Sequence, residues 1–433
     1  MTDELWVLLG DHVAGRVTRK HGTLRFVYDE EYRARRSPTP LSVSMPVETA
    51  VHSDQAVTPW LAGLLPDNES VLARWARTFH VGSSAFALLG SPIGEDCAGA
   101  VRFVTEARLE AALAREGNVE WLDEAGVAQR LRDLRRDQTA WLGSDFTGRF
   151  SLAGAQAKTA LLYQGGHWGI PSGSAATSHI LKPAVAGLDD HDLNEHLCLS
   201  AARRVGLLAA NTRIATFEDQ NAIVAERYDR LAQPEGWIRR IHQEDMCQAL
   251  GVPPDRKYQS DGGPTPTAIA SLLRRVLPGP EADAAVLRFL DALTLNWLIC
   301  GTDAHSKNYS LLLAEHQVRF APLYDVASTL PYAEMPLQKL HLAMKFGGSY
   351  LVASRSPSMW PRVGKELGLS ADLALERAHI LMDRLPDAFA DAASDPSIGA
   401  IKSTMPARLV DAIADRVRKS KATLARTPTI ATE

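Results

Sequence analysis

The stretch Asn296-Trp-Leu-Ile-Cys-Gly-Thr-Asp-Ala-His-Ser-Lys-Asn308 ends an apolar helical pattern and opens a short hairpin pattern. Asp303 is followed five positions on by Asn308, and Asp325 comes later, in Pro322-Leu-Tyr-Asp-Val326. Phosphoryl transfer from a metal-bound nucleotide needs an Asp that orients a hydroxyl and accepts its proton. It also needs oxygen ligands for Mg²⁺, which an amide and a second carboxylate supply. We therefore expect the chemistry of the protein in this stretch.

The spacing of Asp303 and Asn308 alone also fits a helix C-terminal turn followed by a capping Asn. The surrounding pattern favours the chemical interpretation. Residues 284–300 carry an apolar stripe that Gly301 ends, which predicts a helix. Residues 309–313 and 317–321 are expected to form two strands around Ala-Glu-His. Helix, polar loop, hairpin and Asp is the layout of a kinase C-terminal lobe.

Length and composition set the outer limits. A chain of 433 residues is expected to hold two or three domains, and 45% hydrophobic with 23% charged residues is typical of a globular protein. A net charge of -4 gives no global reason to bind nucleic acid. The N-terminus has no signal-like pattern and no run of eighteen apolar residues occurs, so we expect a cytoplasmic protein without membrane contact. The four cysteines form no metal-ligand spacing and are expected to be buried and reduced.

Short patterns along the chain predict the remaining elements. Strands are expected at 5–9, 16–18, 23–28, 41–45 and 222–227, and helices at 71–79, 106–136, 189–205 and 244–250, with residues 354–433 mostly helical. The predicted domains are a β-rich N-terminal module (1–110), connector helices with a kinase N-lobe and phosphate loop (111–230), and a helical C-lobe with catalytic and metal-binding loops (231–433).

Residues 150–162, Phe-Ser-Leu-Ala-Gly-Ala-Gln-Ala-Lys-Thr-Ala-Leu-Leu, enter a strand through small side chains that would let backbone amides approach phosphates. An ordinary turn into an edge strand fits this segment equally well. Lys182, at the end of His179-Ile-Leu-Lys-Pro183, is the candidate cation for the phosphates, although a lone strand Lys is usually a solvated edge residue. Glu195 could pair with Lys182, or could simply favour a helix N-terminus.

Three further features remain open. The segment Glu226-Arg-Tyr-Asp-Arg230 would offer backbone groups to adenine as a linker between lobes. His242 is a possible polar site residue, although a hydrogen-bonded structural histidine is favoured. A solvated face is also favoured for the basic side chains near the C-terminus, Arg408, Arg416, Arg418, Lys419 and Lys421.

Eight motifs occur in one order along the chain. They are Leu-Leu-Pro-Asp-Asn, Ser-Leu-Ala-Gly-Ala-Gln-Ala-Lys-Thr-Ala-Leu, His-Ile-Leu-Lys-Pro, Asn-Glu, Glu-Arg-Tyr-Asp-Arg, His-Gln-Glu-Asp-Met-Cys-Gln-Ala-Leu-Gly, Gly-Thr-Asp-Ala-His-Ser-Lys-Asn and Pro-Leu-Tyr-Asp-Val. With these motifs the chain resembles, nearly end to end, the HipA family, the serine/threonine kinase toxins of bacterial toxin–antitoxin pairs.

The resemblance implies an α+β, two-lobed, protein-kinase-like fold with an N-terminal β-rich subdomain and a mainly helical C-lobe, using ATP and Mg²⁺. Asp303 matches the catalytic base, Asn308 and Asp325 the metal ligands, and Lys182 the phosphate-binding lysine. The other implied nucleotide-binding residues are the phosphate loop (Ala153, Gly154, Ala155, Gln156, Ala157, Lys158), the adenine hinge (Glu226, Arg227, Tyr228), the catalytic loop (His305, Ser306, Lys307) and Tyr324. Ala157 departs from the family, where many members carry an acidic residue or proline.

The resemblance also implies regulation and partners. Ser151 corresponds to the serine that family members autophosphorylate. The usual partner is a small helix-turn-helix antitoxin (HipB-like) that carries the contact with operator DNA, and the implied substrate is an aminoacyl-tRNA synthetase. Two alternatives to an active kinase toxin are a small-molecule phosphotransferase and a kinase-like scaffold that acts only in operon repression. Intact Asp303, Asn308, Asp325 and Lys182 argue against the scaffold.

Overall fold

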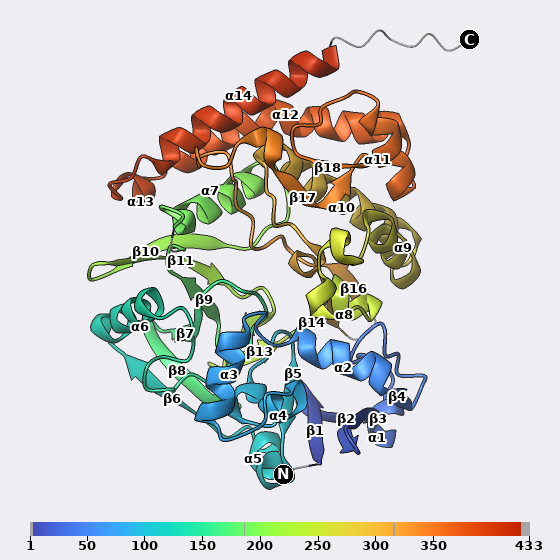
Figure 1. Ribbon diagram of the computed structural model, residues 1–433. Helices are drawn as coiled ribbons and strands as arrows, with labels where there is room; N and C mark the ends of the chain where they lie inside the picture. The colour runs from blue at the N-terminus through green and yellow to red at the C-terminus, as the bar shows by residue number, and fades with distance from the viewer. Residues whose placement is uncertain (1–2, 186, 315–316, 426–433) are drawn as a thin grey trace. The chain divides into compact units, whose positions relative to one another are not determined.

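The computed structural model describes residues 3–185, 187–314 and 317–425 (Figure 1). Contacts within the chain divide it into two compact units, each made of three segments. The first unit holds Met1–Gly187, Ala215–Lys257 and Ser310–Ala321. The second unit holds Leu188–Ile214, Tyr258–Tyr309 and Pro322–Glu433. The borders expected at residues 110 and 230 both fall inside the first unit, so the contacts divide the chain differently from the three domains expected from its order.

The first unit begins with a five-stranded sheet in the order β4-β3-β2-β1-β5. Its strands are β1 (Glu4–Leu9), β2 (His12–Lys20), β3 (Thr23–Tyr28), β4 (Val51–Ser53) and β5 (Val101–Val104). Side chains alternate between the two faces of β1, because Leu5, Val7 and Leu9 enter one core whereas Leu8 packs with Val104 on the other face. Helices α1 (Glu30–Arg33) and α5 (Glu106–Leu113) lie next to this sheet in sequence.

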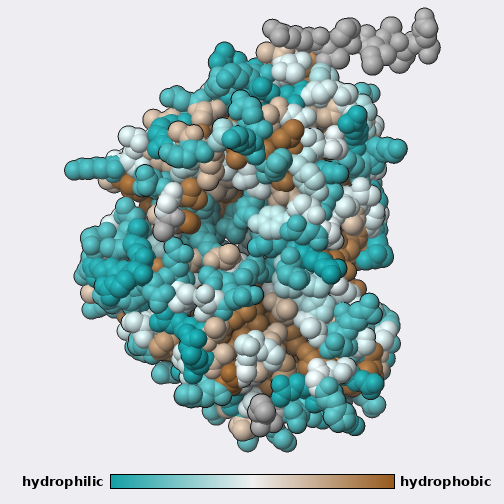
Figure 2. Space-filling view, in the orientation of Figure 1, coloured by the Kyte–Doolittle hydropathy of each residue, from teal (hydrophilic) through white to brown (hydrophobic). Residues whose placement is uncertain are grey.

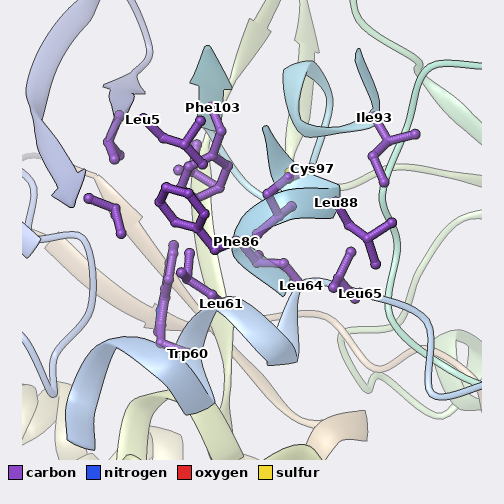
Figure 3. Packing of buried hydrophobic residues seen from close by; sticks show 14 of the residues in the cluster. Leu5, Trp60, Leu61, Leu64, Leu65, Phe86, Leu88, Ile93, Cys97 and Phe103 are labelled. Carbon is purple, nitrogen blue, oxygen red and sulfur yellow. The ribbon is translucent and has the colours of Figure 1, made fainter. Parts of the chain in front are cut away.

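Helices α2 (Asp54–Gly63), α3 (Glu69–Thr78) and α4 (Ala85–Leu89) supply the other half of this core. Figure 3 shows Trp60, Leu61 and Phe86 gathered with Phe103 of β5. Trp60 and Phe103 are fully buried, with their ring centroids 6.4 Å apart. Burying each such side chain stabilises the fold by roughly 1.5–3 kcal/mol. On the face in Figure 2 hydrophilic side chains predominate, with hydrophobic ones in smaller groups between them.

A six-stranded sheet in the order β10-β11-β9-β7-β8-β6 follows. Its strands are β6 (Gly117–Leu122), β7 (Thr159–Gln164), β8 (His167–Gly173), β9 (His179–Lys182), β10 (Thr212–Phe217) and β11 (Gln220–Glu226). Helix α6 (Glu124–Arg136) packs Val127, Ala128 and Leu131 against residues of these strands, among them Leu161 and Val224.

Small sheets and a short helix complete the first unit. β12 (Arg230–Ala232) pairs with β13 (Ile238–Arg240), and β15 (Ser310–Ala314) lies between β14 (His242–Asp245) and β16 (Gln317–Phe320). Helix α8 (Met246–Leu250) begins later than the predicted 244, because Glu244 and Asp245 pair with β15 and Asp245 caps the helix through the amide of Gln248.

The second unit is mainly helical, as expected. Its helices are α7 (His191–Arg204), α9 (Pro266–Val276), α10 (Gly279–Ile299), α11 (Met359–Leu367), α12 (Ala371–Ala393), α13 (Pro396–Gly399) and α14 (Met405–Ala425), with one hairpin of β17 (His341–Phe346) and β18 (Ser349–Leu351). Asp291 is buried in α10 and accepts a bidentate hydrogen bond from Arg377 of α12. Burial raises the pKa of Asp291, and Arg377 opposes that rise. No helix in the described part of the chain is long and apolar enough to cross a membrane.

Two predicted elements were wrong. Residues 106–136 are not continuously helical, because β6 separates α5 from α6 and pairs with β8, for example Trp121 with Gly169. Residues 41–45 form no strand beyond an isolated bridge between Ser42 and Met45. Side chains take the backbone groups that a sheet would need: the Leu41 amide donates to the Tyr28 hydroxyl, and the Val43 amide donates to Glu244. Such long-range partners leave no periodic pattern in the sequence.

Two expectations about polar residues can also be settled. His242 is buried, with Nε2 2.9 Å from the Leu41 carbonyl oxygen and Nδ1 accepting from the Ala100 amide, and burial lowers its pKa to about 4. The structural interpretation of His242 is confirmed. Arg416 does not belong to the basic face of α14, because it is buried and donates to the carbonyls of Trp297 and Val352.

Glu244 gives a pH-dependent test of this fold. Burial raises its pKa to about 7, against an ordinary value of 4.5, while it accepts from Ser42 Oγ at 2.5 Å and from the Val43 amide at 2.8 Å. Between these two values the folded state holds a proton that the unfolded state has lost, so Glu244 costs stability as pH rises through 7. Glu244→Gln cannot ionise. Its free energy of unfolding, relative to that of wild type, should therefore rise by about 2 kcal/mol from pH 5.5 to pH 8.

Thermal and urea unfolding at both pH values would measure this difference, with exposed Glu120→Gln as the matched control. Parallel stability curves for Glu244→Gln and wild type would contradict the assigned cost.

Candidate functional site

In the second unit, the end of α10 fixes where the polar loop begins. Cys300 caps the helix in the left-handed conformation, with φ at 55°, and the Gly301 amide donates to the Asn296 carbonyl. A Cβ on Gly301 would lie 2.3 Å from Asn296 Oδ1, so a larger residue here would displace the buried Asn296 side chain. The helix therefore ends at one defined residue, as the sequence predicted, and the chain turns at once into Asp303.

Hydrogen bonds within the loop orient Asn308. The Asp303 carbonyl accepts from the His305 amide at 2.7 Å and from Asn308 Nδ2 at 2.9 Å. Because a carbonyl oxygen can only accept, the amide nitrogen of Asn308 must face it. This hydrogen bond does not use Asn308 Oδ1, which is the atom of the amide that could bind a metal ion.

The loop around Asn308 is otherwise buried. His305, Ser306 and Lys307 have at most 5% of their surface exposed, and the Tyr324 hydroxyl donates to the Lys307 carbonyl at 2.6 Å. Asp303, in contrast, is exposed. A buried loop that leaves one carboxylate open to solvent suits a base that must meet an acceptor. The structure thus brings together the catalytic-loop residues, Tyr324 and Asn308 predicted from the sequence.

Asp325 has a strained backbone, with φ at 57°. A non-glycine residue in the left-handed region persists only where the surroundings impose it, and such residues cluster at functional sites. On one side, Leu323 forms a parallel bridge with Ala209. On the other side, the Ser328 hydroxyl donates to the Ile299 carbonyl at 2.6 Å and the Thr329 hydroxyl to the Cys300 carbonyl at 2.8 Å. Asp325 is therefore held beside the end of α10, where the polar loop begins.

Asn194 of α7 completes this junction. Its Nδ2 donates to the Ser328 carbonyl at 2.7 Å, and its Oδ1 accepts from the Ser328 amide at 3.0 Å. Sequence reasoning considered the pair Asn194-Glu195 for its glutamate and missed the two hydrogen bonds between Asn194 and Ser328. Glu195 is buried in α7, whereas Lys182 belongs to the first unit. A pairing between Glu195 and Lys182 stays a prediction.

In the first unit, residues 64–67 contact the predicted phosphate loop through their main chain. Ser151 is fully buried and its hydroxyl donates to the Leu64 carbonyl at 2.9 Å. Pro66 forms a parallel bridge with Gly154, and the Asp67 amide donates to the Gly154 carbonyl at 3.0 Å. These contacts give the Leu-Leu-Pro-Asp-Asn motif a structural task that its sequence alone did not reveal.

Lys158 closes the loop from inside. Its Nζ donates to the Ala153 carbonyl at 2.7 Å and lies 4.9 Å from the centre of the Trp141 ring. Gly154 adopts a φ of 104° next to this ammonium group. Lys158 therefore shapes the loop, and its side chain is directed at the loop backbone. The loop residues Ala153 to Ala157 are at least partly exposed, with Ala155 the most open.

Lys182 is not a solvated edge residue. β9 lies between β7 and β11, and Lys182 has only 7% of its surface exposed. Leu181 pairs with Thr159, which directly follows the phosphate loop, so Lys182 and the loop leave the same end of the sheet. Lys182 itself pairs with Ile223 of β11, three residues or roughly 10 Å before Glu226.

The predicted adenine hinge is held by buried ion pairs. Arg227 and Arg230 both bind Asp229 and Asp96, and Arg240 reaches Asp96 at 3.4 Å. Burial alone would raise the pKa of Asp96, but Arg230, Arg227 and Arg240 hold it below its ordinary value. The Arg227 side chain is committed to this cluster, so it can contribute only backbone groups to a nucleotide. Exposed Glu226 and half-buried Tyr228 lie on either side of it.

Asp96 was missed by sequence reasoning. It also links the hinge to the loop, because its carbonyl accepts from the Ser151 amide at 2.9 Å. The signal available was the charge pattern of Glu226-Arg-Tyr-Asp-Arg230, whose buried arginines need more than one aspartate.

The donor set fits a nucleotide-bound Mg²⁺. In the described part of the chain no group of three or more His, Cys, Asp or Glu could hold a metal ion. Asn308 and Asp325 offer an amide oxygen and a carboxylate, which is the small number of protein ligands that Mg²⁺ takes when phosphates and waters complete its shell. The residues present therefore fit the group that the sequence predicted.

The first unit carries a loop of small residues and a lysine in the middle of its sheet. A helix, a polar loop, a hairpin and an aspartate follow in chain order. These are the features of a kinase-like protein. Two family models match the chain: the HipA N-terminal domain over residues 5–104 and the HipA-like C-terminal domain over residues 150–392. The chain belongs to the HipA family of serine/threonine kinase toxins.

Individual relatives agree. The protein named "Putative kinase Y4mE" from Sinorhizobium fredii is 34% identical over 94% of this chain and 96% of its own length. The serine/threonine-protein kinase toxin HipA of Shewanella oneidensis is 27% identical over 88% of each chain. A solved complex of HipA, HipB and operator DNA from Shewanella oneidensis contains a chain that matches with a TM-score of 0.82 and 25% identity, covering 98% of this chain and all of that one. The fold class expected from the sequence is confirmed.

A substitution in the phosphate loop tests whether this loop binds nucleotide. Gly154→Ala puts a side chain at a φ of 104°, which should strain the loop by roughly 1–3 kcal/mol, and the new Cβ would displace Lys158 Nζ, which lies 2.7 Å away. We expect affinity for a fluorescent ATP analogue to fall about tenfold, with a melting temperature close to that of the control variant Gly165→Ala. Gly165→Ala is the matched control, since Gly165 has a φ of 59° in open space at the turn between β7 and β8. Equal affinity losses in both variants would contradict a role for the loop in binding the nucleotide.

Proposed function

We propose that this chain is an ATP-dependent serine/threonine protein kinase toxin of a toxin–antitoxin pair. The observation that carries the proposal is the arrangement at the end of α10, where Asp303 is open to solvent, the Nδ2 hydrogen bond of Asn308 does not use Oδ1, and Asp325 is held in a strained conformation. A protein with no ligand to bind has no need to hold these three side chains in this way.

The residues divide the work between nucleotide and metal. The phosphate loop, Ala153 to Lys158, offers backbone amides to the phosphates of ATP, and Lys182 neutralises their charge. Backbone groups of Glu226 to Tyr228 hold the adenine. Asn308 and Asp325 would hold Mg²⁺, and the ion would supply positive charge beside the transferred phosphate. His305, Ser306, Lys307 and Tyr324 build the loop that carries Asp303.

Asp303 acts as the base. It orients an acceptor hydroxyl toward the γ-phosphorus and takes its proton as the new P–O bond forms and the bond to ADP breaks. Its exposure leaves room for a serine on another protein. In line with the family, that protein is an aminoacyl-tRNA synthetase.

Ser151 is the site of autophosphorylation and of inactivation. Its hydroxyl is fully buried against the Leu64 carbonyl, so the loop must leave this position before Ser151 can be modified. A phosphate adds nearly two negative charges and removes the donor to Leu64. The modified loop cannot return to its place, and ATP binding is lost.

The partner is a HipB-like helix-turn-helix antitoxin. The matched Shewanella oneidensis structure is a complex of HipA with HipB and operator DNA, which supports such a partner here. The net charge of -4 suits a protein that reaches DNA mainly through its antitoxin. The kinase acts in the cytoplasm.

Incubation with labelled ATP and Mg²⁺, followed by phosphosite mapping, tests the proposal. Wild type should label Ser151, and Asp303→Asn should lose at least a hundredfold in rate because its base is gone. Ser151→Ala should take no label at this position but still transfer phosphate to an acceptor. ATP binding without transfer, by wild type that carries no phosphate on Ser151 beforehand, would favour the scaffold. Transfer to a free metabolite without any protein acceptor would favour the small-molecule phosphotransferase.

Mass spectrometry of the purified protein provides the second arm. We expect the fraction phosphorylated on Ser151 to neither bind nor hydrolyse ATP. Full activity of a preparation with stoichiometric Ser151 phosphate would contradict the inactivation.

A further inference from the structure

Tyr258 makes a contact that the proposed chemistry does not explain. Its hydroxyl donates to Asp303 Oδ1 at 2.5 Å, and both residues belong to the second unit. A hydroxyl bound to a carboxylate at 2.5–2.7 Å is a charge-assisted hydrogen bond, about twice as strong as a neutral one. Asp303 is otherwise exposed, so this bond restrains a side chain that solvent would leave free to rotate.

The backbone around Tyr258 is fixed on its own account. The Tyr258 carbonyl accepts from the amides of Asp261 and Gly263, each at 3.0 Å, which closes a tight turn with Gly262 at a φ of 85°. Gln259 Oε1 accepts from the Lys345 amide of β17 at 2.8 Å. The turn is thus bound to the hairpin of the second unit.

The ring of Tyr258 is fixed as well. It meets the buried His305 ring edge-on, with the centroids 5.1 Å apart and the planes at 86°. An edge-to-face contact of this kind favours one orientation of the tyrosine ring. Contacts of its backbone and of its ring therefore hold Tyr258 in place. These contacts fix the position of its hydroxyl independently of Asp303.

We infer that Tyr258 is a positioning residue for the phosphoryl-transfer step, holding Asp303 so that Oδ2 faces the acceptor hydroxyl. This inference rests on the proposed function. A carboxylate accepts about four hydrogen bonds through its two oxygens, so the bond to Oδ1 leaves Oδ2 able to accept the acceptor proton. Holding a reacting group in its productive orientation lowers the barrier without any change in ATP binding.

The opposite role would be a plug. A tyrosine hydroxyl on the base could occupy the place of the acceptor and be displaced by it. Two observations favour positioning. The Tyr258 hydroxyl binds only one of the two carboxylate oxygens. In addition, hydrogen bonds of the surrounding turn hold Tyr258 in place. The two roles predict opposite effects of removing the hydroxyl.

Tyr258→Phe removes the hydroxyl and keeps the ring against His305. Single-turnover transfer from labelled ATP to Ser151, together with total ADP formation, is compared with wild type, Asp303→Asn and Tyr350→Phe. Tyr350 is the matched control, a half-buried tyrosine of β18 whose ring lies 5.2 Å from Lys345 Nζ. We expect Tyr258→Phe to lower the single-turnover rate constant at saturating ATP at least tenfold, with the half-saturating ATP concentration within twofold of wild type, and Tyr350→Phe to match wild type.

The outcomes separate this inference from the proposed function. Wild-type rates in Tyr258→Phe would overturn the positioning role and leave the kinase standing, and a rate above wild type would establish the plug. A parallel loss of the single-turnover rate constant and ATP affinity, or a lowered melting temperature, would show a structural role only. Absence of transfer by the wild-type chain would overturn the proposed function, and the inference with it.

Discussion

The candidate site depends on how the last carbonyl groups of α10 find hydrogen-bond partners. A helix leaves its last carbonyls without partners inside the helix, and here Ser328 and Thr329 donate to those of Ile299 and Cys300. These two side chains stand three and four residues after Asp325. Satisfying the helix end therefore also fixes the backbone of Asp325, and Asn194 locks the same segment from α7.

The first unit solves a different problem, namely how to hold a loop of small residues that cannot pack by itself. The N-terminal module does so through main-chain contacts from Leu64, Pro66 and Asp67, while Asp96 binds both Ser151 and the arginines of the hinge. Buried ion pairs of this kind add little net stability, but the removal of one partner is costly. The β-rich module thus fixes the loop and the hinge, which are the two segments proposed to bind the nucleotide.

Local sequence patterns predicted the elements that carry the site. The apolar stripe of 284–300 with Gly301, and the two runs at 309–313 and 317–321, correspond to α10, β15 and β16 within a few residues. The order of Asp303, Asn308 and Asp325 placed the candidate chemistry. β6 was missed because it is mostly exposed, lies between two charge-rich helices, and pairs with β8, which is about fifty residues away in sequence. The same reason explains why sequence reasoning missed Asp96, Tyr258 and the contacts of residues 64–67 with the phosphate loop. Each of them binds a partner that is distant in sequence.

The most direct measurement is calorimetric titration of a non-hydrolysable ATP analogue, with and without Mg²⁺, into wild type and Asp325→Asn. Asparagine tolerates the left-handed backbone that residue 325 adopts, so this change removes the charge and keeps the conformation. We expect Mg²⁺ to strengthen binding of the analogue to wild type and most of this gain to disappear in Asp325→Asn. An unchanged Mg²⁺ effect in the variant would contradict the assignment of the metal site.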